Sequence, residues 1–260
     1  MSRAIFEVEG DGLYRATEAA LSPWTDQSLH GGPPAMLLAR EIERVPADQP
    51  MFVSRLTVEL MRPFGRVPVG VTSRMIRPGR KVQLVEASLW SGELEVARAT
   101  ALRMRMGDVV VNENNDPPPR DQPESVPAWS GSWRPGAAYH LLGVDVRRPI
   151  QERPEIAPGW AWFRLKLPLV AGEEPSGLLR ICAAADFPNG ISHVVDPRRT
   201  SFVNPDLTIN IHRLPRDEWV LVDARTWLEP HGTGVAEGVL YDRRGRLGRS
   251  TQSLLLEPRS

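Results

Sequence analysis

The sequence predicts an α+β protein built from two copies of one folding unit, each with one helix and a long antiparallel sheet. The main observation is an internal repeat, because segment 56–62 (LTVELMR) returns in similar form at 207–213 (LTINIHR). Aligned without a gap, residues 56–104 and 207–255 are identical at ten of 49 positions. A period this long indicates a duplicated domain rather than a short solenoid repeat. A second observation is that one helix-like segment precedes each copy.

The first half begins with a strand pair over 5–17, which turns at Gly10-Asp11-Gly12. A helix is predicted to open at Gly31-Gly32-Pro33-Pro34 and to continue through 35–44, because prolines cost little in a first helical turn. In the segment 81–90 the alternation of apolar and polar residues changes phase, which is typical of a β-bulge. Turn residues separate four strand-like segments: 52–61, 68–77, 81–90 and 94–105.

Periodicity disappears between 107 and 135, where residues 112–119 (NENNDPPP) have the composition of a linker. The second half then repeats the order of elements: a strand at 160–168, a helix at 176–187, and strands at 202–213, 219–229, 233–242 and 246–256. We therefore divide the chain into a first unit over 1–108, a linker over 109–135 and a second unit over 136–260. Edge-to-edge pairing of the two sheets would remove an exposed strand, and the crevice between the units is the expected ligand site.

The composition excludes or disfavours several classes of function. Lys and Arg together number 32, as do Asp and Glu, so nothing in the charge balance favours binding to nucleic acid or to an anionic membrane. The one cysteine, Cys182, excludes an internal disulfide, and the five histidines show no metal-ligand spacing. The N-terminus lacks the apolar core of a signal peptide, and no apolar run reaches transmembrane length. We expect a soluble cytoplasmic protein without a metal or cofactor.

Five segments in order carry a resemblance to a known family: His30-Gly31-Gly32, 79–87 (GRKVQLVEA), 185–192 (ADFPNGIS), 204–208 (NPDLT) and 248–255 (GRSTQSLL). Together they resemble the type II acyl-CoA thioesterases of the thioesterase superfamily. The resemblance implies a double-hotdog fold, in which a long antiparallel sheet wraps the central helix of each unit. It also implies hydrolysis of an acyl-CoA substrate by an activated water. A homo-oligomer formed through hotdog units is a further expectation.

In that family an aspartate, a Thr or Ser and a Gln hold the attacking water, and these roles carry over to Asp186, Asn204 and Gln252. A carboxylate that follows three alanines on an apolar helix is expensive to bury without partners, although it could also be exposed or cap the next turn. Asn204 departs from the pattern, since its amide can hold a water but has no hydroxyl, and Asn-Pro-Asp is also a common turn. The register leaves Ser253 as an alternative to Gln252 on the opposite strand face, and we favour Gln252.

Gly31 and Gly32 allow close approach of the backbone, and N–H groups at a helix start suit a thioester oxygen or a CoA phosphate. The alternative is a plain tight turn. His30 is assigned to the same oxyanion and substrate-binding group, as a packed or capping residue rather than a base. The chain has no Gly-x-Ser-x-Gly motif and no phosphate-binding glycine loop, so a serine hydrolase or a nucleotide enzyme is not supported.

Two other functions stay open. A hydratase or dehydratase acting on a CoA thioester needs an Asp/His pair on the helix of one unit, and residues 182–186 contain no histidine. A non-catalytic acyl-CoA or lipid-binding protein is the other alternative, because Asn204 lacks the hydroxyl. When the two copies of the repeat are aligned, Val53 is the equivalent of Asn204 and Ala101 is the equivalent of Gln252. The sequence therefore predicts one active site per chain, with polar groups from the second half and a wall from the first.

Overall fold

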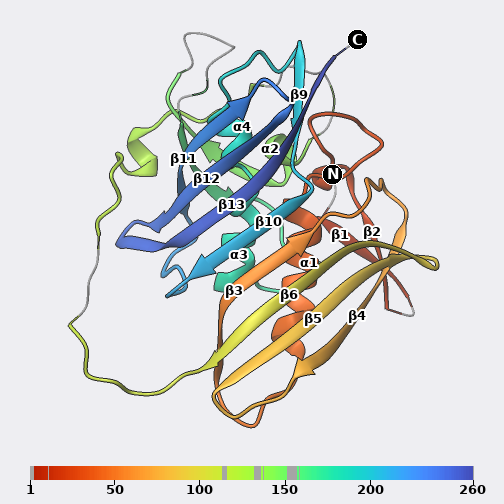
Figure 1. Ribbon diagram of the computed structural model, residues 1–260, viewed down its shortest axis with the longest axis vertical. Coiled ribbons are helices and arrows are strands. Elements are labelled where there is room, and N and C mark those ends of the chain that lie inside the picture. Colours follow the sequence, from red (N-terminus) through yellow and green to blue (C-terminus); the bar gives the residue numbers. More distant parts are fainter. Residues whose placement is uncertain are drawn as a thin grey trace.

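The computed structural model describes residues 3–10, 12–112, 116–131, 136, 138–150, 157 and 159–259. Within these ranges the strands form one large sheet in the order β1-β2-β4-β5-β6-β3-β10-β13-β12-β11-β8-β7, and β9 also pairs with β13 (Figure 1). The first-half strands are β1 (Phe6–Gly10), β2 (Leu13–Ala16), β3 (Met51–Glu59), β4 (Pro68–Arg77), β5 (Val82–Ser91) and β6 (Leu94–Arg105). The others are β7 (Val144–Arg147), β8 (Trp160–Leu165), β9 (Thr200–Val203), β10 (Asp206–Ile211), β11 (Val220–Glu229), β12 (Thr233–Asp242) and β13 (Gly245–Pro258). The helices are α1 (Gly32–Arg44), α2 (Tyr139–Leu142), α3 (Gly177–Ala185) and α4 (Pro188–Ile191), with 3₁₀ turns at Glu18–Ala20 and Pro123–Ser125.

The two halves of the sheet join where β3 pairs antiparallel with β10 in the middle of Figure 1. Thr57 stands directly opposite Thr208, its own counterpart 151 residues later. Each of these strands would be a sheet edge without the other, so the junction protects both, as the sequence predicts.

The sequence repeat is also a repeat of strand register. Directly opposed residues in an antiparallel pair fix which side chains share a face, so a repeated register gives repeated faces. The cross-strand pairs recur with both members shifted by 151 residues: Thr57–Thr100 becomes Thr208–Thr251, Arg74–Glu86 becomes Arg225–Glu237, and Leu89–Ala97 becomes Leu240–Gly248.

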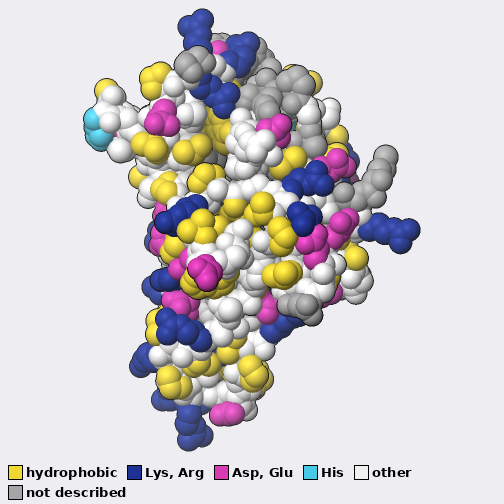
Figure 2. Space-filling model, turned by 90° about the vertical axis from the view of Figure 1, so that its right-hand side faces the viewer, with side chains coloured by type: hydrophobic (Ala, Val, Ile, Leu, Met, Phe, Trp, Pro, Cys, Tyr) yellow, Lys and Arg dark blue, Asp and Glu magenta, His cyan; other side chains and the backbone are white. Residues whose placement is uncertain are grey.

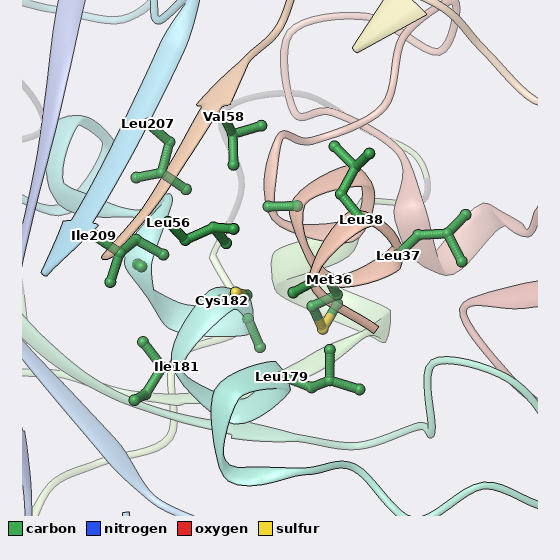
Figure 3. Packing of buried hydrophobic residues seen from close by; sticks show 14 of the residues in the cluster. Met36, Leu37, Leu38, Leu56, Val58, Leu179, Ile181, Cys182, Leu207 and Ile209 are labelled. Carbon is green, nitrogen blue, oxygen red and sulfur yellow. The ribbon is translucent and has the colours of Figure 1, made fainter. Parts of the chain in front are cut away.

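The core lies where α1 and α3 pack against each other and against the inner face of the sheet. Figure 3 shows Met36 of α1 and Cys182 of α3 in one cluster with Leu56 and Ile209 of the central strands. All four side chains are buried. Burying an apolar side chain of this size stabilises the fold by roughly 1.5–3 kcal/mol, which is why both helices are apolar on the side that meets the sheet.

Most predicted elements are confirmed within two residues, and two predictions are wrong in detail. The predicted strand at 202–213 is divided into β9 and β10, because the chain breaks at Asn204-Pro205 while both parts pair with β13. The predicted bulge is not in β5, where Gln83 and Val85 both face inward. The register instead shifts in β4 around Ile76. Gln83 breaks the apolar pattern because its Oε1 accepts a 2.6 Å hydrogen bond from the buried Arg103.

None of the helices in the described ranges is long and apolar enough to cross a membrane. On the face drawn in Figure 2, acidic and basic side chains are interspersed with apolar ones.

Candidate active site

Asp186 is a buried carboxylate at the end of the apolar helix α3. The helix ends at Ala185, Asp186 is its C-cap residue, and Pro188 starts the short helix α4 two residues later. The Asp186 residue is only 3% exposed. A carboxylate removed from water to this extent needs hydrogen-bond donors, so its neighbours define the site.

Two side-chain amides supply donors to the same oxygen of Asp186. Asn204 Nδ2 donates to Oδ1 over 2.8 Å, and Gln252 Nε2 donates to Oδ1 over 2.9 Å. Asn204 lies in the break between β9 and β10, which explains why this segment is not one continuous strand. Gln252 is 1% exposed on the inner face of β13, whereas Ser253 is exposed. Gln252, and not Ser253, therefore faces Asp186.

Asn189 fixes the orientation of both amides. Its backbone N–H donates to Gln252 Oε1 over 3.2 Å, and its Nδ2 donates to Asn204 Oδ1 over 3.3 Å. Because each amide oxygen is engaged by Asn189, each NH₂ group is turned toward Asp186. Asn189 lies in the segment that carries the family resemblance, but its role could not be inferred from the sequence because it depends on contacts with distant strands.

The first half contributes His30, whose Nδ1 lies 2.9 Å from Asp186 Oδ2 and 3.2 Å from the Gly32 backbone nitrogen. A single nitrogen cannot donate to a carboxylate and accept from an N–H at once. Two facing lone pairs would repel, so we assign the proton to Nδ1, which donates to Asp186. With Nδ1 donating to Asp186, the same nitrogen cannot also accept from the Gly32 N–H.

Aromatic rings hold the His30 imidazole in place. Its ring centroid lies 4.5 Å from that of Phe187 and 5.0 Å from that of Tyr139. The hydroxyl of Tyr139 donates to the Ala183 carbonyl over 3.1 Å. Burial, and then the charge of Asp186, raises the pKa of Tyr139, so this phenol stays neutral. His30 is thus packed, as expected from the sequence, and its contact with a carboxylate is the part that the sequence did not reveal.

Gly31 lets the backbone pass against the carboxylate. A Cβ at this position would lie 2.6 Å from Asp186 Oδ2 and 2.8 Å from Leu60 Cδ1. At Gly32 a Cβ would lie 3.2 Å from a ring carbon of Tyr139. Helix α1 starts at Gly32, and Pro33 and Pro34 have no N–H, so the donors that its first turn can offer a ligand are those of Gly31 and Gly32.

These groups border a cavity of about 440 Å³ between the two halves. Asp186, Asn204, His30 and Gly31 all line it, whereas Gln252 and Gly32 do not. Much of the remaining wall is apolar and aromatic: Trp24, Leu29, Phe64, Trp129, Phe163 and Phe187. A largely apolar cavity with a few convergent polar groups is the usual form of a small-molecule site.

Three further residues of the cavity wall were not identified from the sequence. Trp129 belongs to the predicted linker, yet its backbone N–H donates to Val146 on β7 and its ring lies 5.0 Å from that of His140. Burial, followed by the nearby His30, lowers the pKa of His140 to about 4. Burial also lowers the pKa of Arg148 to about 10. The stretch 107–135 has no hydrophobic periodicity, so the sequence did not indicate that Trp129 packs into the cavity wall.

In the first half, the positions equivalent to the amide donors are filled by apolar packing. Val53 and Ala101 are buried there, and Arg103 donates to the Val45 carbonyl over 2.7 Å at the end of α1. An arginine on these carbonyls complements the negative end of the helix dipole. Among the described residues of the first half, the two amide donors of Asp186 therefore have no polar counterpart.

Comparison with known proteins identifies the family. The model of the acyl-CoA thioesterase N-terminal domain matches residues 20–104, and that of the C-terminal domain matches residues 112–256. The chain belongs to the acyl-CoA thioesterase family. No curated protein sequence matched the chain.

Solved structures share the fold of this thioesterase-family chain. A putative thioesterase II from Thermobifida fusca is 18% identical with a TM-score of 0.74, over 98% of this chain and 96% of its own. Acyl-CoA thioesterase II TesB2 from Mycobacterium marinum is 17% identical with a TM-score of 0.69, over 98% and 96%. A protein with a hot dog fold from Alicyclobacillus acidocaldarius is 16% identical with a TM-score of 0.73, over 98% and 96%. At these identities the likeness shows the fold alone, which is a hotdog fold.

Proposed function

We propose that this protein is an acyl-CoA thioesterase that hydrolyses its substrate to a free acid and CoA by direct attack of a water. The observation that carries the proposal is the meeting of Asp186, Asn204 and Gln252 from the second half with His30 and Gly31 from the first. They meet beside an apolar cavity in a chain that matches both domains of the acyl-CoA thioesterase family.

In the proposed reaction, a water hydrogen-bonds to Asp186 Oδ2 and loses a proton to this oxygen as it attacks the acyl carbonyl carbon. Asn204 and Gln252 keep the other carboxylate oxygen occupied, so that Oδ2 is the oxygen presented to the cavity. The N–H group of Gly31, which lines the cavity, stabilises the developing oxyanion. The carbon–sulfur bond then breaks, and the proton passes to the departing CoA thiolate.

The structure also supports a proposal about the domain organisation of the chain. We propose a double hotdog, in which the first unit over 1–108 supplies His30 and the glycines and the second unit over 136–260 supplies the carboxylate and the amides. The repeated strand register and the packing of one long helix against each half of the sheet support this division. The replacement of Asn204 and Gln252 by Val53 and Ala101 supports one active site per chain. A cytoplasmic location and a homo-oligomer remain predictions from sequence.

The test is release of free CoA thiol from short-, medium- and long-chain acyl-CoAs by the purified chain. The variant Asp186→Asn keeps the side-chain size and removes the charge, and we expect kcat to fall by about 10²–10⁴. The matched control is Asp223→Asn, because Asp223 pairs with Arg120 away from the cavity. If Asp186→Asn hydrolyses every substrate within threefold of the wild type, the assignment of Asp186 is wrong. Tight acyl-CoA binding without turnover by the wild type would instead favour the non-catalytic alternative.

A CoA-thioester hydratase or dehydratase is the second candidate, because of the contact between His30 and Asp186. The helix of the second unit carries Asp186 without a histidine, whereas in the structure His30 of the first half supplies the histidine. Such a pair can move protons to and from the carbons next to a thioester carbonyl. Loss of the enoyl-thioester absorbance without release of CoA would support this candidate, and release of CoA without hydration supports the thioesterase.

A further inference from the structure

A hollow of about 620 Å³ lies on the outer face of the sheet, where β3, β10 and β13 run side by side. Arg55 on β3 stands opposite Asn210 on β10, which in turn stands opposite Arg249 on β13. Residues directly opposed across neighbouring strands point to the same side of a sheet. The adjacent Leu56 and Ile209 are buried on the inner face, so this row of three faces outward, away from Asp186 and the apolar cavity.

The hollow gathers more positive than negative charge. Arg246 and His212 also line it, and the acid among its described lining residues is Asp116, whose Oδ2 lies 4.0 Å from Arg246 Nη1. Burial, followed by the charges of Arg213 and Arg246, lowers the pKa of His212. Two arginines keep unused donors within the described part of the chain: Nε of Arg55 is buried without a hydrogen-bond partner, and Arg249 forms no ion pair there.

The internal repeat supplies a comparison on the same backbone. Arg98 is the counterpart of Arg249, and its Nε donates to Glu95 over 2.8 Å. The position equivalent to Glu95 in the second half is Arg246. The repeated register shift after Leu89 and Leu240 keeps these two positions equivalent in space.

The reversal of charge continues along the row. The counterpart of Arg55 is the acidic Asp206, and the counterpart of Asn210 is the acidic Glu59. The two equivalent rows therefore differ in charge. The row Asp206–Glu59–Arg98 is acidic, and its arginine is neutralised by Glu95, whereas the row Arg55–Asn210–Arg249 is basic. The arginine cluster is not needed to form the strand pairing, because the equivalent row has the same pairing without it.

We propose that this hollow binds a small ligand that carries a diphosphate group. Strands lie about 4.8 Å apart, so Arg55 and Arg249 start from positions about 10 Å apart with Asn210 between them. Two guanidinium groups at this separation can each hold one phosphate in bidentate geometry, with the Asn210 amide as a further donor. The ligand is either free diphosphate or the diphosphate of a nucleotide. The site is separate from the thioester chemistry, because the sheet lies between the two.

The test is calorimetric titration of the full-length protein with inorganic diphosphate, and in a second arm with ADP, at low ionic strength. We expect saturable binding that weakens as salt is added, since the contacts are charged. Arg55→Gln and Arg249→Gln should each weaken binding about tenfold or more. Arg98→Gln is the matched control, because it removes the equivalent arginine from the acidic side, and it should leave binding unchanged.

Two readouts keep the result clear. Thermal unfolding of each variant shows that it is folded, and CoA release should be unchanged in Arg55→Gln because the hollow lies outside the candidate active site. If diphosphate and ADP bind with equal affinity, the phosphates alone are recognised. If ADP binds more tightly, the protein also contacts the nucleoside. Either result supports the proposed site. No saturable binding of either ligand at millimolar concentration, or an equal loss in Arg98→Gln, overturns the proposal.

Discussion

The closest test of the site geometry is the substitution Gly31→Ala, which adds one methyl group against the carboxylate of Asp186. The added Cβ would lie 2.6 Å from Asp186 Oδ2, and ordinary van der Waals contact begins at 3.4 Å. The carboxylate or the start of α1 must therefore move by about 0.8 Å, and Leu60 Cδ1 at 2.8 Å blocks the other direction. Relief of such a contact typically costs about 1–3 kcal/mol of stability.

The same displacement should also lower the rate of catalysis. A displacement of about 1 Å at a reacting group can lower the rate about 10²-fold, which corresponds to about 2.7 kcal/mol of transition-state stabilisation. We therefore expect kcat/KM for CoA release to fall about 100-fold in Gly31→Ala while the protein stays folded.

Gly190→Ala is the control for this measurement. Gly190 lines the same cavity, but an added Cβ there would have no described atom within 4 Å. This variant should keep kcat/KM within about threefold of the wild type. If Gly31→Ala keeps wild-type activity, or if both variants lose activity equally, close approach of Gly31 to Asp186 is not what the reaction requires.

Two predictions concern stability. Arg40 of α1 is buried and its Nε donates to Glu173 over 2.7 Å, so Glu173→Gln should lower the free energy of unfolding by about 1–3 kcal/mol in urea titrations; an unchanged value would contradict this. His140 has its pKa lowered to about 4, below the ordinary 6.5, so between these pH values the unfolded chain binds the extra proton and stability falls as the pH falls, by about 1.4 kcal/mol per pH unit. His140→Phe should reduce that slope, and an identical slope in both proteins would refute this origin.

The fold could be predicted because its causes lie in local patterns. Alternating residues, turn glycines and prolines, and the repeat at 56–62 and 207–213 each leave a signal in the sequence. Where prediction failed, a tertiary contact decided the outcome. The sequence predicted a change of phase near Gln83 because polar residues are expected to face outward. Gln83 faces inward instead, because its side chain accepts a hydrogen bond from the buried Arg103.

The candidate site was predictable only in part for the same reason. Asp186, Asn204 and Gln252 were identified through resemblance, and composition or spacing alone would not have joined them. The contact of His30 with Asp186 links distant parts of the chain, and no periodic pattern records a pair of polar side chains that meet across an interface. Trp129 lies in a stretch rich in proline and polar residues whose packing depends on β7.

The junction of Thr57 and Thr208 has a consequence for how the protein acquires activity during folding. Each half builds most of its sheet from strands near in sequence, whereas β3 and β10 must find each other across most of the chain. Contacts with long sequence separation close late, because the entropy of the intervening loop must be overcome first. Gly31 of the first half and Asp186 of the second are also far apart in the sequence, so their contact closes a long loop as well. Recovery of CoA release therefore reports on long-range steps of refolding, whereas circular dichroism reports also on local ones.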